Sequence, residues 1–353
     1  MDWLGLSHEQ LLVRKEVAEF CRKEVAPVAL ELDRQGIAPT ELFAKLAAMG
    51  AYAIPLPEAQ GGANLGMLST VVALEEMARV FPSLALCAAV QTMVALSVAH
   101  GGSERLQKEV GASIACGTDA AAMSLSDTTV AATATSSAIL VEGELDLIAN
   151  GSFAQYLLLQ LSTEGETQWG LCRLPLATIQ SQGVQAVGFR AGGLAKARFA
   201  AAEVADWQVL KQIDERIAGW RSLLLAAVAV GMCQGCLDKS VPYARARHQF
   251  GQPIATFDMV RRLLGEISWR TASARLITYD AAFQSDHGAS AAERIAMAFA
   301  CSRESAMVCA DCAVQVFGGY GYTKDYQPEM FFRDAKFLEA LSPSVSEARC
   351  RLV

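Results

Sequence analysis

The hydrophobic pattern changes its period twice along this chain, and the order of those changes restricts the possible folds. Apolar residues recur at helical spacing up to about residue 118, then form short Thr-, Val- and Ile-rich segments, then return to helical spacing. Helical spacing predicts helices with one buried face, and the short segments predict strands. We therefore expect a multidomain α and β protein with an N-terminal α-helical domain (1–118), a middle β domain (119–209) and a C-terminal helical bundle (210–353).

Local signals place several element boundaries. Ser7 is a predicted helix N-cap, with Gln10 as its capping-box partner, and Gly36 marks the end of that helical pattern. In the middle region, Glu142-Gly143 and Asn150-Gly151 read as turns between strands.

The last part of the chain predicts three long helices. They span about 216–247, with Pro242 as a possible kink, 256–284 and 290–317.

Composition excludes several classes of protein. With 52% hydrophobic and 19% charged residues the chain is globular, and its net charge of −7 argues against nucleic-acid binding. Residues 83–99 and 222–237 are apolar, but both are shorter than the roughly 20 residues of a membrane span and both contain a glutamine. We expect buried helices there and no membrane span. The first ten residues lack the charged-then-apolar pattern of a signal peptide.

Ten cysteines occur, and four of them form two C-x-x-C pairs. The pairs Cys233/Cys236 and Cys309/Cys312 make a four-cysteine zinc site conceivable. Each pair lies inside a long apolar helical pattern, where cysteine packs as a small hydrophobe, and we favour core packing. This cysteine usage fits a reducing, cytoplasmic environment.

Two segments in the C-terminal part carry the most specific signals. "YARARHQFGQPI" follows a long helix and places Arg247 and Phe250 beside a sharp turn; Arg247 is either an anion clamp or a cation complementing a helix C-terminus. "QVFGGYGYTKDYQPEMFFRDAK" contains Gln315 and the adjacent Gly318 and Gly319, which let a backbone approach a ligand closely or simply cap a helix.

Together these segments resemble the acyl-CoA dehydrogenase family, whose patterns look like Y-A-x-x-R-x-x-F-G-x-P-I and Q-x-x-G-G-x-G-Y…R-D-A-K. The loop "PEAQGGANLGMLSTVVALEEMAR" resembles the family's first-domain segment, so the resemblance covers nearly the whole chain. It implies a helical domain, a β domain and a four-helix bundle, assembled as a tetramer. It also implies FAD at a subunit interface, a CoA thioester as substrate, and a glutamate that removes its α-proton while hydride leaves to the flavin.

The family's glutamate is missing from both of its usual places. Ser342 occupies the position of the terminal-loop glutamate, and Arg221 occupies the alternative position on the first helix of the last domain. A serine hydroxyl needs an activating partner to act as a base, and no histidine lies nearby in the sequence. Asp214 and Glu215, about two turns upstream of Arg221, are weak alternative candidates.

The middle domain also departs from the family pattern around the flavin ring. The first flavin-framing segment is shortened to "MSLSDTT". In the second, Leu145, Leu147 and Ala149 replace the family's lysine, aromatic residue and threonine. The resemblance assigns the "R-x-x-F-G" and "Q-x-x-G-G" segments to a neighbouring subunit's FAD. This chain thus keeps the residues that, by the resemblance, bind a neighbouring subunit's FAD: Arg247, Phe250, Gln315, Gly318 and Gly319. It lacks the residues that would bind the flavin ring in its own middle domain.

Three hypotheses follow. The first is a catalytically incomplete subunit of a heteromeric, heterotetrameric acyl-CoA dehydrogenase that shares FAD with a homologous partner subunit; such members are associated with bulky substrates such as steroid side-chain CoA thioesters. The second is a self-sufficient FAD enzyme with a displaced base. The third is a non-enzymatic homologue that binds a CoA thioester or a protein.

Overall fold

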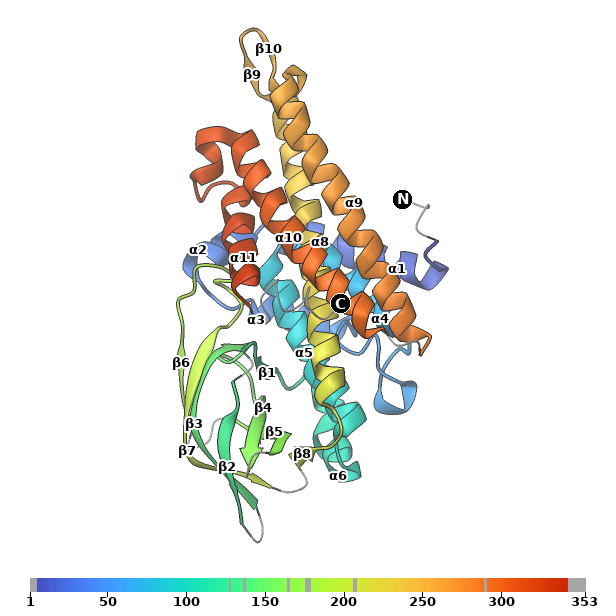
Figure 1. Cartoon of the computed structure of the whole chain (residues 1–353), viewed down its shortest axis with the longest axis vertical. Helices are drawn as coiled ribbons and strands as arrows, with labels where there is room; N and C mark the ends of the chain where they lie inside the picture. The colour runs from blue at the N-terminus through green and yellow to red at the C-terminus, as the bar shows by residue number, and fades with distance from the viewer. Residues whose placement is uncertain are drawn as a thin grey trace.

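The computed structural model describes residues 5–126, 128–135, 138–163, 166–174, 179–205, 208–288 and 291–341. It has the expected order of a helical region, a β region and a second helical region (Figure 1). The β region lies at one end of the long axis, and the hairpin between the two longest helices lies at the other end.

The N-terminal region is helical. Its α-helices are α1 (His8–Phe20), α2 (Ala29–Gln35), α3 (Thr40–Ala48), α4 (Gly66–Ala78), α5 (Pro82–Gly101), α6 (Glu104–Leu106) and α7 (Ala112–Ala115). Two π-helical turns, Cys21–Val25 and Gln107–Gly111, and a 3₁₀ turn, Glu58–Gln60, interrupt them. The capping box at Ser7 is confirmed, since the Ser7 backbone N–H donates to Gln10 Oε1 at 2.8 Å. Gly36 ends α2 with a φ of 67°, as its position predicts.

The middle region is a mixed sheet. Its strands are β1 (Ala121–Ser124), β2 (Val130–Ala134), β3 (Ala138–Ala149), β4 (Tyr156–Thr163), β5 (Glu166–Arg173), β6 (Ile179–Gly183), β7 (Ala195–Ala205) and β8 (Val209–Leu210). The order along the sheet is β6-β7-β3-β1-β4-β5-β8, with β2 pairing with β3 and β4. The β1–β4 and β2–β4 pairs are parallel, and the other pairs are antiparallel.

The turn expected at Glu142-Gly143 is wrong, because β3 runs through it as one strand of 12 residues. The pairing of β3 with β7 shifts register between Val141 and Gly143, and Gly143 has a φ of 132°. Because glycine has no side chain, Gly143 can adopt this φ and form a bulge inside the strand. The turn at Asn150 is confirmed, since Asn150 has a φ of 62° and its side-chain amide donates to Cys87 O and Ala121 O.

The C-terminal region holds the longest helices. They are α8 (Asp214–Ala246), α9 (Asp258–Asp286), α10 (Ala292–Phe317) and α11 (Gln327–Ala340), with the short strands β9 (His248–Gln249) and β10 (Gln252–Pro253) between α8 and α9. The 3₁₀ turns Ile254–Thr256 and Gly318–Tyr322 complete it. The predicted long helix at 216–247 is confirmed, and it continues as one helix through Pro242.

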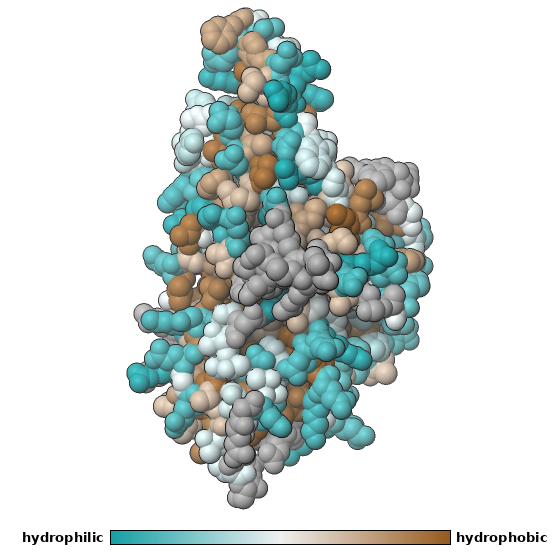
Figure 2. All heavy atoms as spheres, in the orientation of Figure 1, coloured by the Kyte–Doolittle hydropathy of each residue, from teal (hydrophilic) through white to brown (hydrophobic). Residues whose placement is uncertain are grey.

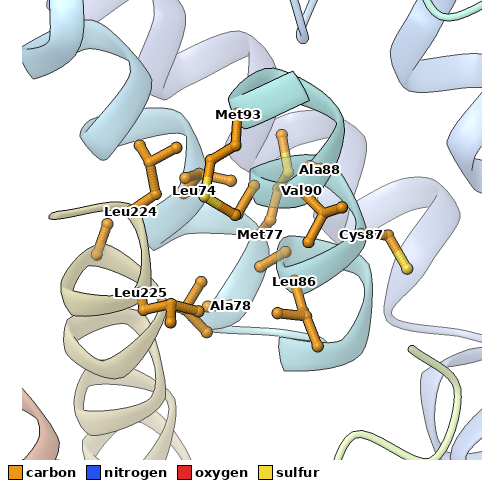
Figure 3. Packing of buried hydrophobic residues seen from close by; sticks show 14 of the residues in the cluster. Leu74, Met77, Ala78, Leu86, Cys87, Ala88, Val90, Met93, Leu224 and Leu225 are labelled. Atoms are coloured by element: carbon orange, nitrogen blue, oxygen red, sulfur yellow. The ribbon is translucent and has the colours of Figure 1, made fainter. Parts of the chain in front are cut away.

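The core lies where α4, α5 and α8 meet (Figure 3). Leu74 and Met77 of α4 pack beside Leu86 and Met93 of α5 and Leu224 of α8, and all of these side chains are buried. Among the residues that the structure describes, two helices, α5 and α8, are long and apolar enough to cross a membrane. However, 94% and 72% of their most apolar windows are buried inside the protein, so the core accounts for their hydrophobicity.

The two C-x-x-C pairs lie in this core on α8 and α10. The Cys233 thiol is hydrogen-bonded to Cys309, and burial raises the pKa of Cys233 and Cys236 well above the ordinary thiol value. Among the described residues, no group of three or more His, Cys, Asp or Glu side chains has metal-binding geometry. A buried thiol with a raised pKa is unreactive, which suits a packing role.

Candidate functional site

The first sequence motif forms an exposed hairpin at the far end of α8. Arg247 is the residue at which α8 ends, and its backbone is extended, with φ −78° and ψ 123°. Gln249 pairs with Gln252 across the hairpin. Phe250 and Gly251 form its two-residue turn, both with positive φ (52° and 79°), as a type I′ turn requires. The Phe250 side chain is 92% exposed, so a bulky residue occupies a strained turn and meets its own chain only edge-on at the ring of Phe257, with centroids 6.2 Å apart, among the described ring contacts.

The second motif forms the loop that follows α10. Gly318 has a φ of 60° and ψ of −135°, a combination that only glycine adopts readily. A Cβ at Gly318 or Gly319 would meet no atom within 4 Å, so the backbone here is open to a ligand. Gly321 is different, because a Cβ there would lie 2.4 Å from Val314 O. Gln315 is exposed in the last turn of α10.

Aromatic stacking holds the two motifs together. The rings of Tyr243 and Phe317 stack with centroids 4.0 Å apart and an interplanar angle of 12°, and Tyr326 packs edge-on to Phe317 at 5.6 Å. The Arg247 guanidinium lies 5.8 Å from the ring centroid of Tyr320. Segments about 70 residues apart in the sequence thus present one guanidinium beside an open glycine backbone.

This arrangement suits a phosphate or another anion. An arginine binds a phosphate with two parallel N–H donors, and an open glycine backbone can approach it closely. Within the described part of the chain, no carboxylate lies within ion-pair distance of Arg247, so no acidic side chain there competes for the guanidinium.

The three described candidate positions for the base all lie in the first two turns of α8. Arg221 lies in the second turn of α8 and is half-buried. Asp214 accepts a hydrogen bond from Trp169 Nε1 at 2.8 Å, which ties the start of α8 to β5. Glu215 is exposed to solvent. Ser342 lies outside the described residues.

The three replaced positions on β3 point into apolar surroundings. Leu145 and Ala149 are fully buried, each in a hydrophobic cluster of the core, and Leu147 packs against one of these clusters. Leu147 has a φ of 60° beside a register shift, and its carbonyl accepts the backbone N–H of Leu125. None of these side chains offers a polar group to a ligand.

A chain of hydroxyl groups beside this strand escaped the sequence reasoning. Ser124 Oγ and Ser126 Oγ are 2.9 Å apart, and Ser126 Oγ donates to Thr128 Oγ1 at 3.0 Å. Ser124 Oγ also donates to the carbonyl of Asp146 on β3, next to Leu147. The segment "MSLSDTT" contained this signal, since its serines alternate along a strand end and so share one face.

Comparison with known proteins then decides the family. The family model "Acyl-CoA dehydrogenase, N-terminal domain" matches residues 7–118, and "Acyl-CoA dehydrogenase, C-terminal domain" matches residues 210–342. A probable acyl-CoA dehydrogenase of Bacillus subtilis, YngJ, is 30% identical over 95% of this chain and 94% of its own length. The chain belongs to the acyl-CoA dehydrogenase family.

Other members of the family span the same length. The cyclohex-1-ene-1-carbonyl-CoA dehydrogenase of Geobacter metallireducens is 30% identical over 95% of this chain and 94% of its own. The structure of butyryl-CoA dehydrogenase from Megasphaera elsdenii superposes with a TM-score of 0.93, covering 98% of this chain and 97% of its own at 22% identity, and so shows the shared fold.

In this member of the acyl-CoA dehydrogenase family, the segment "RDAK" (residues 333–336) joins three regions of the chain. The guanidinium of Arg333 binds Asp33 of α2 at 2.5 Å and Glu329 at 2.7 Å. Asp334 is fully buried and accepts the backbone N–H of Phe189, from the loop between β6 and β7, at 2.5 Å. Burial raises the pKa of Asp334 to about 8. This segment therefore has a structural role, joining α11 to the N-terminal and β regions.

Proposed function

We propose that this chain is the catalytically incomplete subunit of a heteromeric acyl-CoA dehydrogenase and that it completes the FAD site of a homologous partner. The observation that carries the proposal is the contrast between the open anion site at the hairpin and the apolar side chains of β3 in the chain's own β region. The two lie at opposite ends of the long axis (Figure 1). The 33 residues of α8 run from beside β8 to the hairpin, a length of about 50 Å at 1.5 Å per residue.

This separation supports a shared site. A cofactor whose phosphates lie at Arg247 cannot reach β3 of the same chain across the length of α8. The guanidinium of Arg247 and the open backbone at Gly318 and Gly319 fit the diphosphate of FAD. The apolar side chains of Leu145, Leu147 and Ala149 do not fit the polar edge of a flavin ring.

In the proposed complex this chain binds and orients, and the partner carries the chemistry. FAD, when bound, supplies a hydride acceptor for α,β-desaturation of a CoA thioester. Arg247, Phe250, Gln315, Gly318 and Gly319 of this chain hold the phosphate and adenosine half of the partner's FAD. The partner supplies the carboxylate that accepts the α-proton. We extend the proposal to bulky acyl groups of the steroid type, with which two-chain members of the family are associated.

The decisive experiment is to quantify flavin per chain. The chain is expressed alone, and it is also co-expressed with each other member of the family encoded in its source genome. We expect little FAD in the chain alone and near-stoichiometric FAD with acyl-CoA dehydrogenase activity in one mixed complex. Stoichiometric FAD in the lone chain, or no mixed complex with any relative, would contradict the proposal.

A second candidate function is supported by the hydroxyl chain Ser124–Ser126–Thr128, which lies beside β3 and could contact a flavin in this chain's own site. In that case the protein is a self-sufficient flavoenzyme with a displaced base. The same experiment separates the two, because FAD would then be bound by the lone chain. Ser126→Ala would lower its FAD content in that case only.

A further inference from the structure

The ends of four helices meet around a surface cavity of about 350 Å³. They are the N-terminal ends of α4 and α8 and the C-terminal ends of α5 and α9. We call it the helix-end cavity, and the side chains that carry its chemistry are Met67, Leu96, His100, Arg216, Trp220 and Asp286. Arg216 lies in the first turn of α8, whereas Arg247 follows the last residue of that helix, about 45 Å away at 1.5 Å per residue. The helix-end cavity is therefore separate from the anion site at the hairpin.

This cavity differs from the mixed surface around it. On the face of the molecule seen in Figure 2, hydrophobic residues lie scattered among hydrophilic ones. Apolar side chains scattered in this way are ordinary on a folded protein and do not indicate a binding site. A hollow in which charged, aromatic and apolar groups converge is more specific, because each kind of group recognises a different part of one ligand.

Arg216 pairs with a neutral imidazole in this cavity. Its guanidinium donates to Nδ1 of His100 at 3.0 Å. A guanidinium can only donate, so Nδ1 is the acceptor and the proton of the imidazole ring is on Nε2. Burial and the neighbouring guanidinium lower the pKa of His100, which keeps the imidazole neutral at pH 7. Within the described part of the chain, no carboxylate lies within ion-pair distance of Arg216, so its charge is not compensated there.

Asp286, at the end of α9, has its charge satisfied by the backbone of α4. Its Oδ1 accepts the N–H of Met67 at 2.5 Å, and its Oδ2 accepts the N–H of Leu68 at 2.9 Å. Both N–H groups belong to the first turn of α4, where the helix dipole also favours a negative charge. The carboxylate of Asp286 therefore caps α4. The uncompensated charge among the described residues that line the cavity is that of Arg216.

Apolar groups complete the lining of the cavity. The indole ring of Trp220 has its centroid 5.4 Å from that of His100, and the buried side chains of Met67 and Leu96 add apolar surface. We propose that the helix-end cavity binds a small organic carboxylate, whose charged group is held by Arg216 and by Nε2–H of His100. The apolar part of the ligand packs against Trp220. This inference does not depend on the proposed function, because it involves no partner subunit and no FAD.

A single carboxylate fits the cavity better than a phosphate. One guanidinium supplies one positive charge, and the neutral imidazole supplies a donor without charge. A phosphate group carries close to two negative charges at neutral pH, and the carboxylate of Asp286 repels the second of them. Inorganic phosphate also has no apolar part for the indole of Trp220 to contact.

The chain contains 4 histidines, so the signal of each can be followed by NMR of the full chain labelled with 13C-histidine. His100→Gln identifies the His100 signal. The labelled chain is titrated with benzoate, with its neutral analogue benzamide and with inorganic phosphate. Arg216→Gln removes the proposed charge, and Arg22→Gln, at an exposed position of the π-helical turn after α1, is the matched control. Circular dichroism checks that every variant is folded.

We expect benzoate to shift the His100 signal saturably in the millimolar range and to raise the pKa of His100, because a bound anion favours the imidazolium form. Arg216→Gln should weaken benzoate binding by at least about 10-fold. Arg22→Gln should stay within about twofold of wild type. Benzamide and phosphate should shift the signal less than benzoate does.

Two results would overturn the site itself: a His100 signal that benzoate does not shift, or equal benzoate binding by Arg216→Gln and wild type. A shift with benzamide or with phosphate as large as that with benzoate would overturn the assignment of the ligand as an organic carboxylate.

Discussion

Tyr243 of α8 and Phe317 of α10 stack with ring centroids 4.0 Å apart, and Tyr243 Oη donates to the carbonyl of Phe317 at 3.3 Å. This contact joins the end of one helix to the residue before Gly318. It therefore fixes the position of Arg247 relative to the glycine loop, on which the anion site depends.

Tyr243→Leu should weaken this contact between α8 and α10. The variant keeps apolar bulk but loses the ring stack and the hydrogen bond, each of which contributes about 0.5–1.5 kcal/mol. We expect a loss of about 1–3 kcal/mol in the free energy of unfolding and faster amide exchange at residues 318–322, measured by hydrogen–deuterium exchange. Tyr243→Phe is the matched control, because it loses only the hydroxyl. Unchanged exchange in Tyr243→Leu would show that the stack does not hold the loop.

Arg247→Ala should lower FAD affinity in the mixed complex. A charge-assisted contact to phosphate contributes about 1.5–3 kcal/mol, which corresponds to roughly 10- to 150-fold in affinity. Arg247→Lys should recover only part of the loss, since an ammonium group lacks the two-pronged geometry of a guanidinium. FAD occupancy and melting temperature are measured on the same samples, with Arg22→Ala as an exposed-arginine control. Full occupancy with a slightly lower melting temperature would mean that Arg247 only complements the helix dipole.

Ser342→Glu should not convert the lone chain into a dehydrogenase. A carboxylate at this position has no flavin to work with, because the β3 side chains Leu145, Leu147 and Ala149 give a ring no polar contact. The measurement is anaerobic bleaching of flavin absorbance on addition of an acyl-CoA, with the mixed wild-type complex as the positive control. Bleaching by the single-chain variant would show that this subunit has a usable flavin site.

Asp334 should make the folded state less stable as the pH rises. A carboxylate held by an ion pair has the opposite effect, because its pKa is lowered on folding. Burial raises the pKa of Asp334 to about 8, above the ordinary value of 3.8, so the folded state favours the protonated form. The contribution of the protonated side chain to the free energy of unfolding is complete below pH about 4 and is lost as the pH rises to about 8. Asp334→Asn stays neutral and keeps an acceptor for Phe189 N–H, so its melting temperature should fall less between pH 5 and 8 than that of wild type.

The exposed Asp325→Asn is the control for this experiment, because Asp325 is largely in solvent and its ion pair among the described residues is with Arg34 at the surface. Its pH profile should follow that of wild type. Parallel profiles for wild type and Asp334→Asn would mean that another group sets the pH dependence.

The regular parts of this fold were predictable from the sequence because periodicity and capping are local signals. Ser7, Gly36 and the span of α8 follow from neighbouring residues alone, and all three are confirmed. Gly143 was misread, because a glycine in a bulge and a glycine in a turn look the same without knowledge of the partner strand β7.

The site was partly predictable for a related reason. Arg247 and Gly318 stood out through motifs, but their proximity depends on a contact between Tyr243 and Phe317, 74 residues apart in the sequence. The alternating residues of the hydroxyl chain, Ser124 and Ser126, were visible in the sequence, but the hydrogen bond from Ser124 Oγ to the carbonyl of Asp146 depends on the pairing of β1 with β3. The structural role of Asp334 was hidden too, since its partner is a backbone N–H, which no side-chain pattern reveals.

The uninterrupted course of α8 has a mechanical consequence. The helix is about 50 Å long and packs against α4, α9 and α10, so a rotation of this bundle by about 5° about the start of α8 would displace the hairpin by about 4 Å. A small movement at the start of α8 is therefore amplified at the hairpin. The hydrogen bond from Trp169 to Asp214 joins the near end of this helix to the β region, so α8 connects two parts of the molecule that lie at opposite ends of its long axis (Figure 1).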